Sequence, residues 1–356
     1  MTNALEIDTA ASRDFDWSAV HTYLSGIVPH LKGPMRVFQF PGGFSNMTYL
    51  VSVGDTDLVL KRPPAGPRPK GAHDMRREYQ ILAGLRDRYR YAPAAIAYCA
   101  DESMAGADFL VMERVAGVVV RPDEIEARHI TNAQLRGQLE GLIDALASLH
   151  AVDPEIALPG FGRPDGYRER QVEGWLARME KAATPGMAEF AHIKAWLNAN
   201  AARELARTAV VHNDFKLDNL VWREDAINLL KAVLDWEMAT VGDPLMDLAC
   251  TLSFWVQRDD PADFRALRAM PSAFDGAPSR ADAFERYRLA SGTDARDFRF
   301  YLCFAMFRRA VIEQQKFARF RSGHSTDMRY AELDSSVAAL LRMAWQIANG
   351  EGSAFD

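Results

Sequence analysis

The spacing of hydrophobic residues differs between the first third of the chain and the rest. After a polar leader, hydrophobic residues recur at helical spacing from Trp17 to Ile27, which predicts a helix that ends before Gly33-Pro34. Short apolar runs then predict strands at residues 36–40, 48–53, 57–61, 96–99 and 109–112. A turn at residues 54–56 joins the second and third strands, and a helix beginning near Asp74 precedes the fourth.

From about residue 120 onwards, the hydrophobic residues follow a helical period. One stripe runs from Leu135 to Leu149 and ends at His150, which is interpreted as a structural histidine near a helix C-terminus. Further helices are predicted around residues 172–179, 193–197, 298–320 and 335–348. The predicted fold class is therefore α+β with two lobes. Residues 1–115 are predicted to form an N-terminal lobe with an antiparallel sheet and a helix. This lobe includes a leader and first helix at residues 1–33. Residues 116–356 are predicted to form a larger, mainly helical lobe.

Composition is that of an ordinary globular protein, because the 356 residues are 48% hydrophobic and 25% charged. The net charge of −6 argues against nucleic acid as the main partner, since a phosphate-binding surface normally has a basic excess. The chain has no apolar run long enough to cross a membrane and no signal-peptide pattern at its start, so we expect a cytoplasmic protein with no membrane partner. Cys99, Cys250 and Cys303 lack C-x-x-C spacing and are predicted to be buried free thiols.

The stretch from residue 210 to 249 carries the strongest candidate chemistry. His212, Asp214 and Asn219 form the pattern H-x-D-x-x-x-x-N, and Asp235 follows later in the same stretch. Phosphoryl transfer from a nucleotide needs one carboxylate near the attacking hydroxyl, together with a carboxamide and a second carboxylate that hold Mg²⁺. The pattern is short, so its meaning depends on whether the first lobe supplies a nucleotide site.

Several residues of the first lobe are candidates for that nucleotide site. The loop at residues 41–46 contains Gly43, Ser45 and Asn46, and such a loop either brings backbone N–H groups close to phosphates or is an ordinary hairpin turn. Lys61 ends a strand and Glu78 lies one turn into the next helix, which is the order of the lysine–glutamate pair in kinase-like lobes.

The fifth predicted strand leads into a flexible joint. The backbone groups of Glu113 and Val115 lie where a nucleotide-binding lobe would hinge, and they could bind an adenine. Lys61, Glu78, Asp214, Asn219 and Asp235 thus occur in the order found in kinases.

At these residues the chain resembles the aminoglycoside phosphotransferase and choline kinase superfamily, which has the two-lobe fold of protein kinases. The resemblance covers nearly the whole chain, and His212-Asn213-Asp214 is similar to the choline-kinase version of the motif. A narrower resemblance is to the kinase modules fused to some acyl-CoA dehydrogenases and to their stand-alone bacterial relatives. Residues 43–46, 60–66, 72–73, 77–79, 234–237 and 242–244 carry it.

The resemblance implies ATP and Mg²⁺ as cofactors and a role for each candidate residue. Asp214 would be the catalytic base or would orient the hydroxyl, and Asn219 and Asp235 would hold Mg²⁺. Lys61 would contact the α- and β-phosphates, and Glu78 would orient Lys61. Ser45 and Asn46 would lie over the phosphates.

Other residues are assigned supporting roles. His212 would brace the catalytic loop, and Asp243 and Asp247 would hold its backbone. Glu237 follows Asp235 by two residues and is left open, because it could reach a second metal ion. The loop lacks G-x-G-x-x-G and Asp235 is followed by Trp-Glu instead of Phe-Gly, as in small-molecule kinases, so no case remains for a protein substrate.

The predicted function is an ATP- and Mg²⁺-dependent phosphotransferase acting on a hydroxyl group of a small molecule. The narrower resemblance favours a hydroxyacyl-CoA or a related hydroxy compound, and an aminoglycoside or choline-type alcohol is the alternative. The phosphates of a CoA ester would need basic residues, for which Arg68, Lys70, Arg76 and Arg77 are candidates; the other interpretation of the basic cluster from Arg62 to Arg90 is a solvated surface. A catalytically silent nucleotide-binding protein is the alternative from another class. A serine or cysteine hydrolase is disfavoured, because the chain has no G-x-S-x-G.

Overall fold

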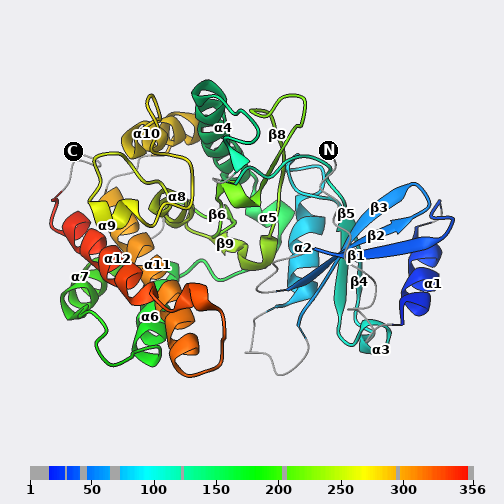
Figure 1. The fold of residues 1–356 in the computed structure, drawn as a ribbon, viewed down its shortest axis with the longest axis horizontal. Helices are drawn as coiled ribbons and strands as arrows, with labels where there is room; N and C mark the ends of the chain where they lie inside the picture. Colours follow the sequence, from blue (N-terminus) through cyan, green and yellow to red (C-terminus); the bar gives the residue numbers. More distant parts are fainter. Residues whose placement is uncertain are drawn as a thin grey trace. The chain divides into compact units, whose positions relative to one another are not determined.

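A computed structural model describes residues 16–28, 30–40, 46–64, 73–121, 124–202, 207–293 and 297–351 (Figure 1). The chain forms two compact units. Unit 1 contains Met1–Gly117 and Lys231–Ala239, and unit 2 contains Val118–Leu230 and Thr240–Asp356. The sequence placed all of residues 116–356 in the second lobe, whereas the short segment Lys231–Ala239 belongs to unit 1.

Unit 1 is built on an antiparallel sheet. Within its described residues, the strands have the order β1-β2-β3-β5-β4. The elements are α1 (Trp17–Ile27), β1 (Met35–Gln39), β2 (Met47–Val53), β3 (Thr56–Arg62), α2 (Met75–Leu85), β4 (Ala95–Cys99), α3 (Glu102–Ala105), β5 (Phe109–Glu113) and the 3₁₀ turn η4 (Trp236–Met238). The predicted strands and helices of this region are present, with boundaries that differ by one or two residues.

A tight hairpin sets the register of the two strands that flank the candidate site. Val53 pairs with Thr56, so Gly54 and Asp55 are the two turn residues. Gly54 has φ +57°, and a Cβ there would lie 2.4 Å from the carbonyl oxygen of Lys32, so only glycine fits. The same register places Lys61 opposite Thr48 of β2.

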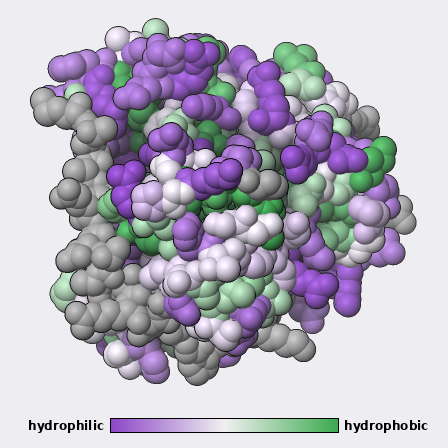
Figure 2. All heavy atoms as spheres, turned by 90° about the vertical axis from the view of Figure 1, so that its right-hand side faces the viewer, coloured by the Kyte–Doolittle hydropathy of each residue, from purple (hydrophilic) through white to green (hydrophobic). Residues whose placement is uncertain are grey.

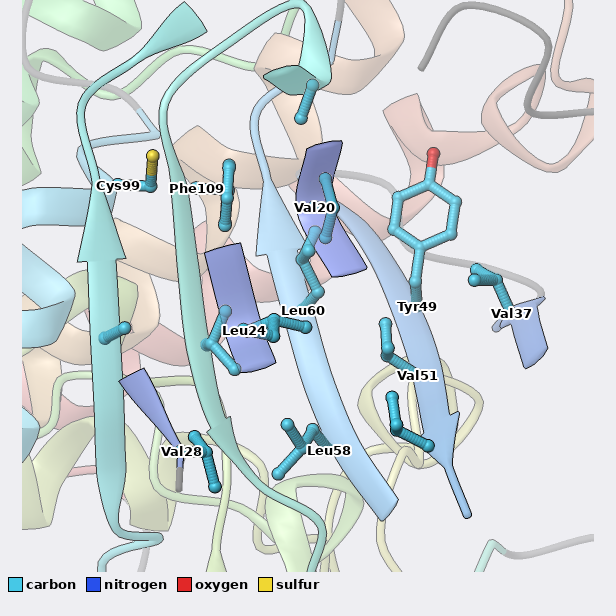
Figure 3. Packing of buried hydrophobic residues seen from close by; sticks show 14 of the residues in the cluster. Val20, Leu24, Val28, Val37, Tyr49, Val51, Leu58, Leu60, Cys99 and Phe109 are labelled. Atoms are coloured by element: carbon cyan, nitrogen blue, oxygen red, sulfur yellow. The ribbon is translucent and has the colours of Figure 1, made fainter. Parts of the chain in front are cut away.

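The two faces of the sheet have different partners. Side chains alternate across a strand, so Leu58 and Leu60 of β3 join the core beneath α1, which also contains Val20 and Leu24 (Figure 3). Lys61 therefore lies on the opposite face, where α2 packs against β4 and β5. Burying each large apolar side chain of this core contributes roughly 1.5–3 kcal/mol, which holds the strand that presents Lys61.

Unit 2 is mainly helical. Its elements are α4 (Asn132–His150), α5 (Pro154–Ala157), α6 (Tyr167–Lys181), α7 (Ala191–Ala201), β6 (Ala209–Val211), η3 (Leu217–Asn219), β7 (Leu220–Trp222), β9 (Thr240–Gly242), α8 (Pro244–Ser253), α9 (Ala262–Arg265), α10 (Arg280–Ser291), α11 (Phe298–Arg321), η5 (Met328–Tyr330) and α12 (Leu333–Ala348). Strand β8 (Leu230–Val233) lies where the chain passes from unit 2 into unit 1.

Helix α11 is the centre of unit 2. It packs against α12, α8, α6 and α7, and its buried aromatic residues fill the space between them. The short strands β6 and β9 are antiparallel, with Val210 paired to Val241. This pairing brings the residues before His212 next to those before Asp243.

The predicted α+β class is confirmed, and so are three buried free cysteines. None of the helices in the described part of the chain is both long and apolar enough to cross a membrane. On the face shown in Figure 2, hydrophilic residues cover much of the surface and hydrophobic residues are interspersed among them.

Candidate active site

In unit 1, a buried lysine lies between two carboxylates. Lys61 Nζ is 3.0 Å from Oε1 of Glu78 and 2.8 Å from Oδ1 of Asp235. Glu78 is presented by the first turn of α2, which begins where Asp74 accepts a hydrogen bond from the N–H of Arg77. The sequence predicted the Lys61–Glu78 pair, but the contact with Asp235 depends on the return of the chain to unit 1.

The charges of this cluster do not cancel. Burial alone would lower the pKa of Lys61, but the negative charges of Glu78 and Asp235 outweigh burial and raise the pKa above its ordinary range. Burial raises the pKa of Glu78, and the ammonium group of Lys61 opposes this change. One ammonium group thus faces two carboxylates, and the side chain of Asp235 is 38% exposed. The cluster suits a ligand that brings positive charge.

The segment that carries Asp235 is fastened to the rest of unit 1. Asp235 has φ +64°, a left-handed conformation that turns the chain into η4. Trp236 is buried, donates to the carbonyl of Val233 and packs edge-on against Tyr89. The carbonyl of Ala239 accepts a hydrogen bond of 2.9 Å from Arg77.

The predicted basic cluster between Arg62 and Arg90 is therefore not uniformly a solvated surface. Arg62 is buried, and Arg77 is half-buried with its guanidinium group on the carbonyl of Ala239. Arg76 is exposed, whereas Arg68 and Lys70 lie outside the described residues.

The glycine-containing loop is described only at its end. Gly43 and Ser45 lie outside the described residues, so their predicted roles stay predictions. Asn46 is buried, with its amide nitrogen 2.6 Å from Oε2 of Glu237 and its amide oxygen 2.9 Å from Nδ1 of His73. The sequence assigned Asn46 to the phosphates, whereas here its amide contacts other side chains of unit 1.

The predicted adenine contacts lie where β5 ends. Glu113 is the last residue of β5, and its N–H donates to the carbonyl of Ala94. This N–H is already used, so a contact between Glu113 and an adenine would have to come from its carbonyl oxygen. Val115 follows in the irregular segment beyond the strand and is half-buried.

In unit 2, a second polar cluster surrounds Asp214. Nδ2 of Asn219 donates to the carbonyl oxygen of Asp214 at 2.8 Å and to Oδ2 of its side chain at 3.0 Å. Nζ of Lys216 lies 3.1 Å from Oδ1 and 2.9 Å from Oδ2 of Asp214. Sequence reasoning missed Lys216, although a lysine two residues after a candidate catalytic aspartate could have indicated it.

Each cluster, taken by itself, offers an oxygen of the kind that Mg²⁺ prefers. The amide nitrogen of Asn219 faces Asp214, so the carbonyl oxygen of the same amide is directed elsewhere and is a suitable metal ligand. Asp235 carries a carboxylate that is partly exposed. Magnesium prefers hard oxygen ligands, and Asn219 and Asp235 each offer one.

The backbone of the loop before Asp214 is held by Asp247 of α8. Oδ2 of Asp247 accepts from the N–H of His212 at 2.6 Å, and Oδ1 accepts from the N–H of Asn213 at 2.7 Å. Burial alone would raise the pKa of Asp247, but hydrogen bonds and the nearby imidazoles of His150 and His212 lower the pKa below its ordinary value.

His150 and His212 serve the same loop. His150 is buried, with Nε2 3.2 Å from Asp247 and Nδ1 2.7 Å from the hydroxyl of Tyr287. Nδ1 of His212 accepts from the N–H of Asp214 at 3.3 Å, which matches a bracing role. Asp243 instead accepts from the N–H of Leu245 as the N-cap of α8, so it positions the helix and not the loop itself.

A buried arginine that sequence reasoning also missed completes the loop. Arg308 of α11 donates to the carbonyl of Asn213 at 2.8 Å and to Sγ of Cys250 at 2.7 Å. Asn213 has φ +65°, and its carbonyl and N–H are both held by other residues. Helix α11 carries several arginines among its aromatic residues, and their spacing does not reveal that Arg308 points inward.

Residues 37–284 match the model of the phosphotransferase enzyme family. The chain belongs to this family. The resemblance predicted from the sequence is confirmed. Phosphotransferase chemistry on hydroxyl groups is consistent with the carboxylate, carboxamide and lysine positions described above.

Two curated relatives of this phosphotransferase are acyl-CoA dehydrogenase family members. Member 11 of Gallus gallus is 31% identical over 94% of this chain and 44% of the relative. Member 10 of Mus musculus is 30% identical over 94% of this chain and 31% of the relative. The chain thus spans less than half the length of these curated relatives.

Solved structures have the same fold. A Ralstonia eutropha protein, provisionally assigned as an aminoglycoside phosphotransferase, has a TM-score of 0.81 and 28% identity, covering 95% of this chain and 100% of that one. Choline kinase of Cryptosporidium parvum (TM-score 0.58, 12% identity, 94% of this chain and 98% of that one) shows the fold alone. So does aminoglycoside phosphotransferase APH(4)-Ia in a complex with ADP and hygromycin B (TM-score 0.57, 18% identity, 94% and 100%).

Proposed function

We propose that this phosphotransferase is an ATP- and Mg²⁺-dependent kinase that phosphorylates a hydroxyl group of a small molecule. The observation that carries the proposal is the buried ammonium group of Lys61 between Glu78 and Asp235. A lysine in this position has no solvent-facing role to explain it, and holding it charged in the interior requires such partners. A structure of the same fold with bound ADP supports a nucleotide as the phosphate donor.

The nucleotide is assigned to residues of unit 1. Lys61 contacts the α- and β-phosphates, and Glu78 keeps its ammonium group in place. The phosphate roles of Gly43 and Ser45 rest on the sequence resemblance alone, and the adenine is assigned to backbone groups of Glu113 and Val115. Bound Mg²⁺ would neutralise charge on the transferring phosphoryl group, with Asn219 and Asp235 as its protein ligands.

The acceptor is assigned to residues around Asp214 in unit 2. The acceptor oxygen attacks the γ-phosphorus, the bond to the β,γ-bridging oxygen breaks to release ADP, and the proton of the hydroxyl passes to Asp214. Asn219 and Lys216 hold the Asp214 carboxylate from two sides, which limits its rotation. Lys216 also offers a positive charge to the phosphoryl oxygens.

We further propose a hydroxyacyl-CoA or a related hydroxy compound as the acceptor. The support is that the curated relatives matching over 94% of this chain are acyl-CoA dehydrogenase family members. Exposed Arg76 is available for the phosphates of CoA. The likeness to an aminoglycoside phosphotransferase at 28% identity favours an aminoglycoside as the second candidate.

The test is a screen for ATP consumption with hydroxyacyl-CoAs, aminoglycosides, sugars and choline-like alcohols. Purified chain is incubated with ATP and Mg²⁺, and phosphorylated products are identified by mass spectrometry. We expect turnover with one or more hydroxyacyl-CoAs, and strongly reduced turnover in the matched Asp214→Asn protein. Turnover with aminoglycosides alone would overturn the acceptor but not the kinase assignment.

A binding measurement separates the kinase from a catalytically silent protein. Isothermal calorimetry with AMP-PNP and Mg²⁺ should give a dissociation constant of about 1 μM to 1 mM, the usual range of enzyme KM values. Binding without turnover on any acceptor would favour the silent nucleotide-binding protein, and absence of binding would reject the proposal.

A further inference from the structure

A carboxamide, a carboxylate and an imidazole meet beside the Lys61 cluster in unit 1. Asn46 precedes β2, and only 3% of its surface is exposed. Its Nδ2 lies 2.6 Å from Oε2 of Glu237, which is 191 residues away in sequence. Its Oδ1 lies 2.9 Å from Nδ1 of His73. Three separate segments of the chain thus converge on one buried amide.

The directions of these hydrogen bonds follow from the carboxylate. An ionised glutamate can only accept, so Nδ2 of Asn46 donates to Glu237. The oxygen of the same amide then faces His73 and must accept, which requires the proton of the imidazole on Nδ1. Each end of the Asn46 amide therefore has a definite partner, and an aspartate or leucine of the same size could not replace it.

Each of the three residues adjoins an element assigned to the nucleotide. Asn46 follows directly after residues 41–45, the loop assigned to the phosphates. Glu237 follows Asp235 by two residues within the η4 turn. His73 directly precedes Asp74, the N-cap of α2, which is the helix that presents Glu78 to Lys61.

We propose that Asn46, His73 and Glu237 form a positioning clasp that fixes the Asp235 segment against the start of β2. Glu237 acts through Asn46 and is not a second metal ligand. The inference rests on the proposed function, because the roles of Asp235 and of the phosphate loop come from it.

The geometry explains why such a clasp matters. Asp235 is in a left-handed conformation, is partly exposed and has the ammonium group of Lys61 on one oxygen. Trp236 and Ala239 fasten the segment to β8 and α2. The charge-assisted hydrogen bond from Asn46 to Glu237 links the segment to the start of β2. Loss of the clasp should weaken binding of the Mg²⁺–nucleotide and raise its KM more than it lowers kcat, since Asp214 belongs to unit 2.

The first test is a double-mutant cycle on binding of AMP-PNP with Mg²⁺, measured by calorimetry. Asn46→Ala and Glu237→Ala should each raise the Kd about tenfold, because each breaks the same link. The double variant should also show a rise of about tenfold. A rise of about a hundredfold in the double variant would mean that the two residues act independently, which overturns the clasp.

The second test distinguishes a positioning residue from a metal ligand. Glu237→Gln keeps an acceptor for Asn46 but removes the charge, so it should restore the Kd to within about twofold of the wild type. A metal ligand would lose affinity on the same change, since a neutral oxygen binds Mg²⁺ more weakly. The proposal would be overturned if Glu237→Gln bound the nucleotide as weakly as Glu237→Ala while Asn46→Ala kept the Kd of the wild type. The matched control is Ser52→Ala, which removes a 2.5 Å hydrogen bond to Asp57 elsewhere in the same sheet. Any effect of Ser52→Ala on the Kd should add to the effect of Glu237→Ala.

A third measurement does not depend on nucleotide. In the nucleotide-free protein, Asn46→Ala and Glu237→Ala should lower the midpoint of thermal unfolding, and the double variant should lower it no further than the larger single effect. Additive shifts would overturn the clasp. If the wild type binds no nucleotide at all, the proposed function fails, and the unfolding cycle alone then decides whether the clasp exists.

Discussion

The two polar clusters hold their carboxylates in different ways. In unit 1, Glu78 and Asp235 share one ammonium group, and the partners are side chains that carry charge. In unit 2, the buried Asp247 binds the backbone N–H groups of His212 and Asn213, and the imidazole of His150 is a further partner. The first cluster has an excess of negative charge next to the partly exposed carboxylate of Asp235. The second cluster fixes the backbone of the loop before Asp214.

This difference separates two tasks of a phosphotransferase. A site for a Mg²⁺–nucleotide must attract positive charge and bind phosphate, so side chains with unequal charges suit it. A catalytic loop must hold one carboxylate at a fixed position, and backbone hydrogen bonds to a buried anchor achieve this without adding charge near the acceptor. Variants of the two clusters should therefore fail in different measurements.

The largest effect is expected from Asp214, the residue proposed to contact the acceptor and take its proton. Asp214→Asn should lower kcat by about 10²–10⁴-fold, because it removes the group that takes the proton. The affinity for the Mg²⁺–nucleotide, measured by calorimetry, should change little, since the phosphate contacts are assigned to unit 1. Near-normal turnover with the correct acceptor would show that the role assigned to Asp214 is wrong.

The next effect should come from the charge cluster of unit 1. Lys61→Met removes the proposed phosphate contact and leaves Glu78 buried without its ammonium partner, so kcat/KM should fall by about 10²-fold or more and nucleotide binding should weaken. Lys32→Met, on an exposed lysine of the same unit, is the matched control and should bind nucleotide normally. If Lys61→Met kept wild-type nucleotide affinity, the assignment of the nucleotide to this cluster would have to be abandoned.

Substitution of Asp247, which holds the loop before Asp214, should lower the stability of the protein more than it weakens nucleotide binding. In Asp247→Asn, one of the two loop N–H groups faces the amide NH₂ group, which cannot accept a hydrogen bond. The substitution should therefore lower the free energy of unfolding by about 3 kcal/mol. Urea unfolding of Asp247→Asn and of Asp144→Asn compares it with an exposed aspartate of α4, whose substitution should cost under about 0.5 kcal/mol. Equal costs for the two would contradict the anchoring role.

The lowered pKa of Asp247 also predicts that the free energy of unfolding depends on pH. The pKa of Asp247 is lowered in the folded protein, so the folded state binds this proton more weakly than the unfolded chain, whose aspartate pKa is about 3.9. The stabilisation that ionised Asp247 contributes is complete at a pH above the unfolded-state pKa. It is lost as the pH falls through the lower pKa of Asp247 in the folded protein. Urea unfolding of the wild type and of Asp247→Asn should differ by a constant amount down to about pH 4 and converge below it. Convergence near pH 6 would point to a different titrating group.

The smallest effect is expected from two adjacent arginines of α11. Arg308→Met removes the donor to the carbonyl of Asn213 and should lower kcat by about tenfold, or about 1.4 kcal/mol, with nucleotide affinity unchanged. Arg309 is equally buried but donates to the carbonyls of Ser253 and Leu267, away from the loop. Arg309→Met should therefore lower the unfolding midpoint without a selective loss of kcat. Identical kinetics in the two variants would show that Arg308 has only a structural role.

The helices, the strands and most of the candidate chemistry could be predicted from local patterns in the chain. Strand alternation placed Leu60 and Lys61 on opposite faces of β3, and the hydrophobic stripe of α4 ended at His150 as predicted. The spacing of His212, Asp214 and Asn219 became a prediction of a catalytic loop only beside Lys61, Glu78 and Asp235, although the residues of the loop itself stay close in space. Local patterns succeed where the interactions are local.

Which distant residues meet could not be predicted in this way and depends on the packing of the folded chain. The return of Lys231–Ala239 to unit 1 brings Asp235 onto Lys61 and Glu237 onto Asn46. The inward position of Arg308 depends on how α11 packs against α8, and the helical period of α11 does not reveal it. The physical reason is that a hydrogen bond between residues about two hundred positions apart leaves no periodic trace in the sequence, because it is set by the packing of whole elements.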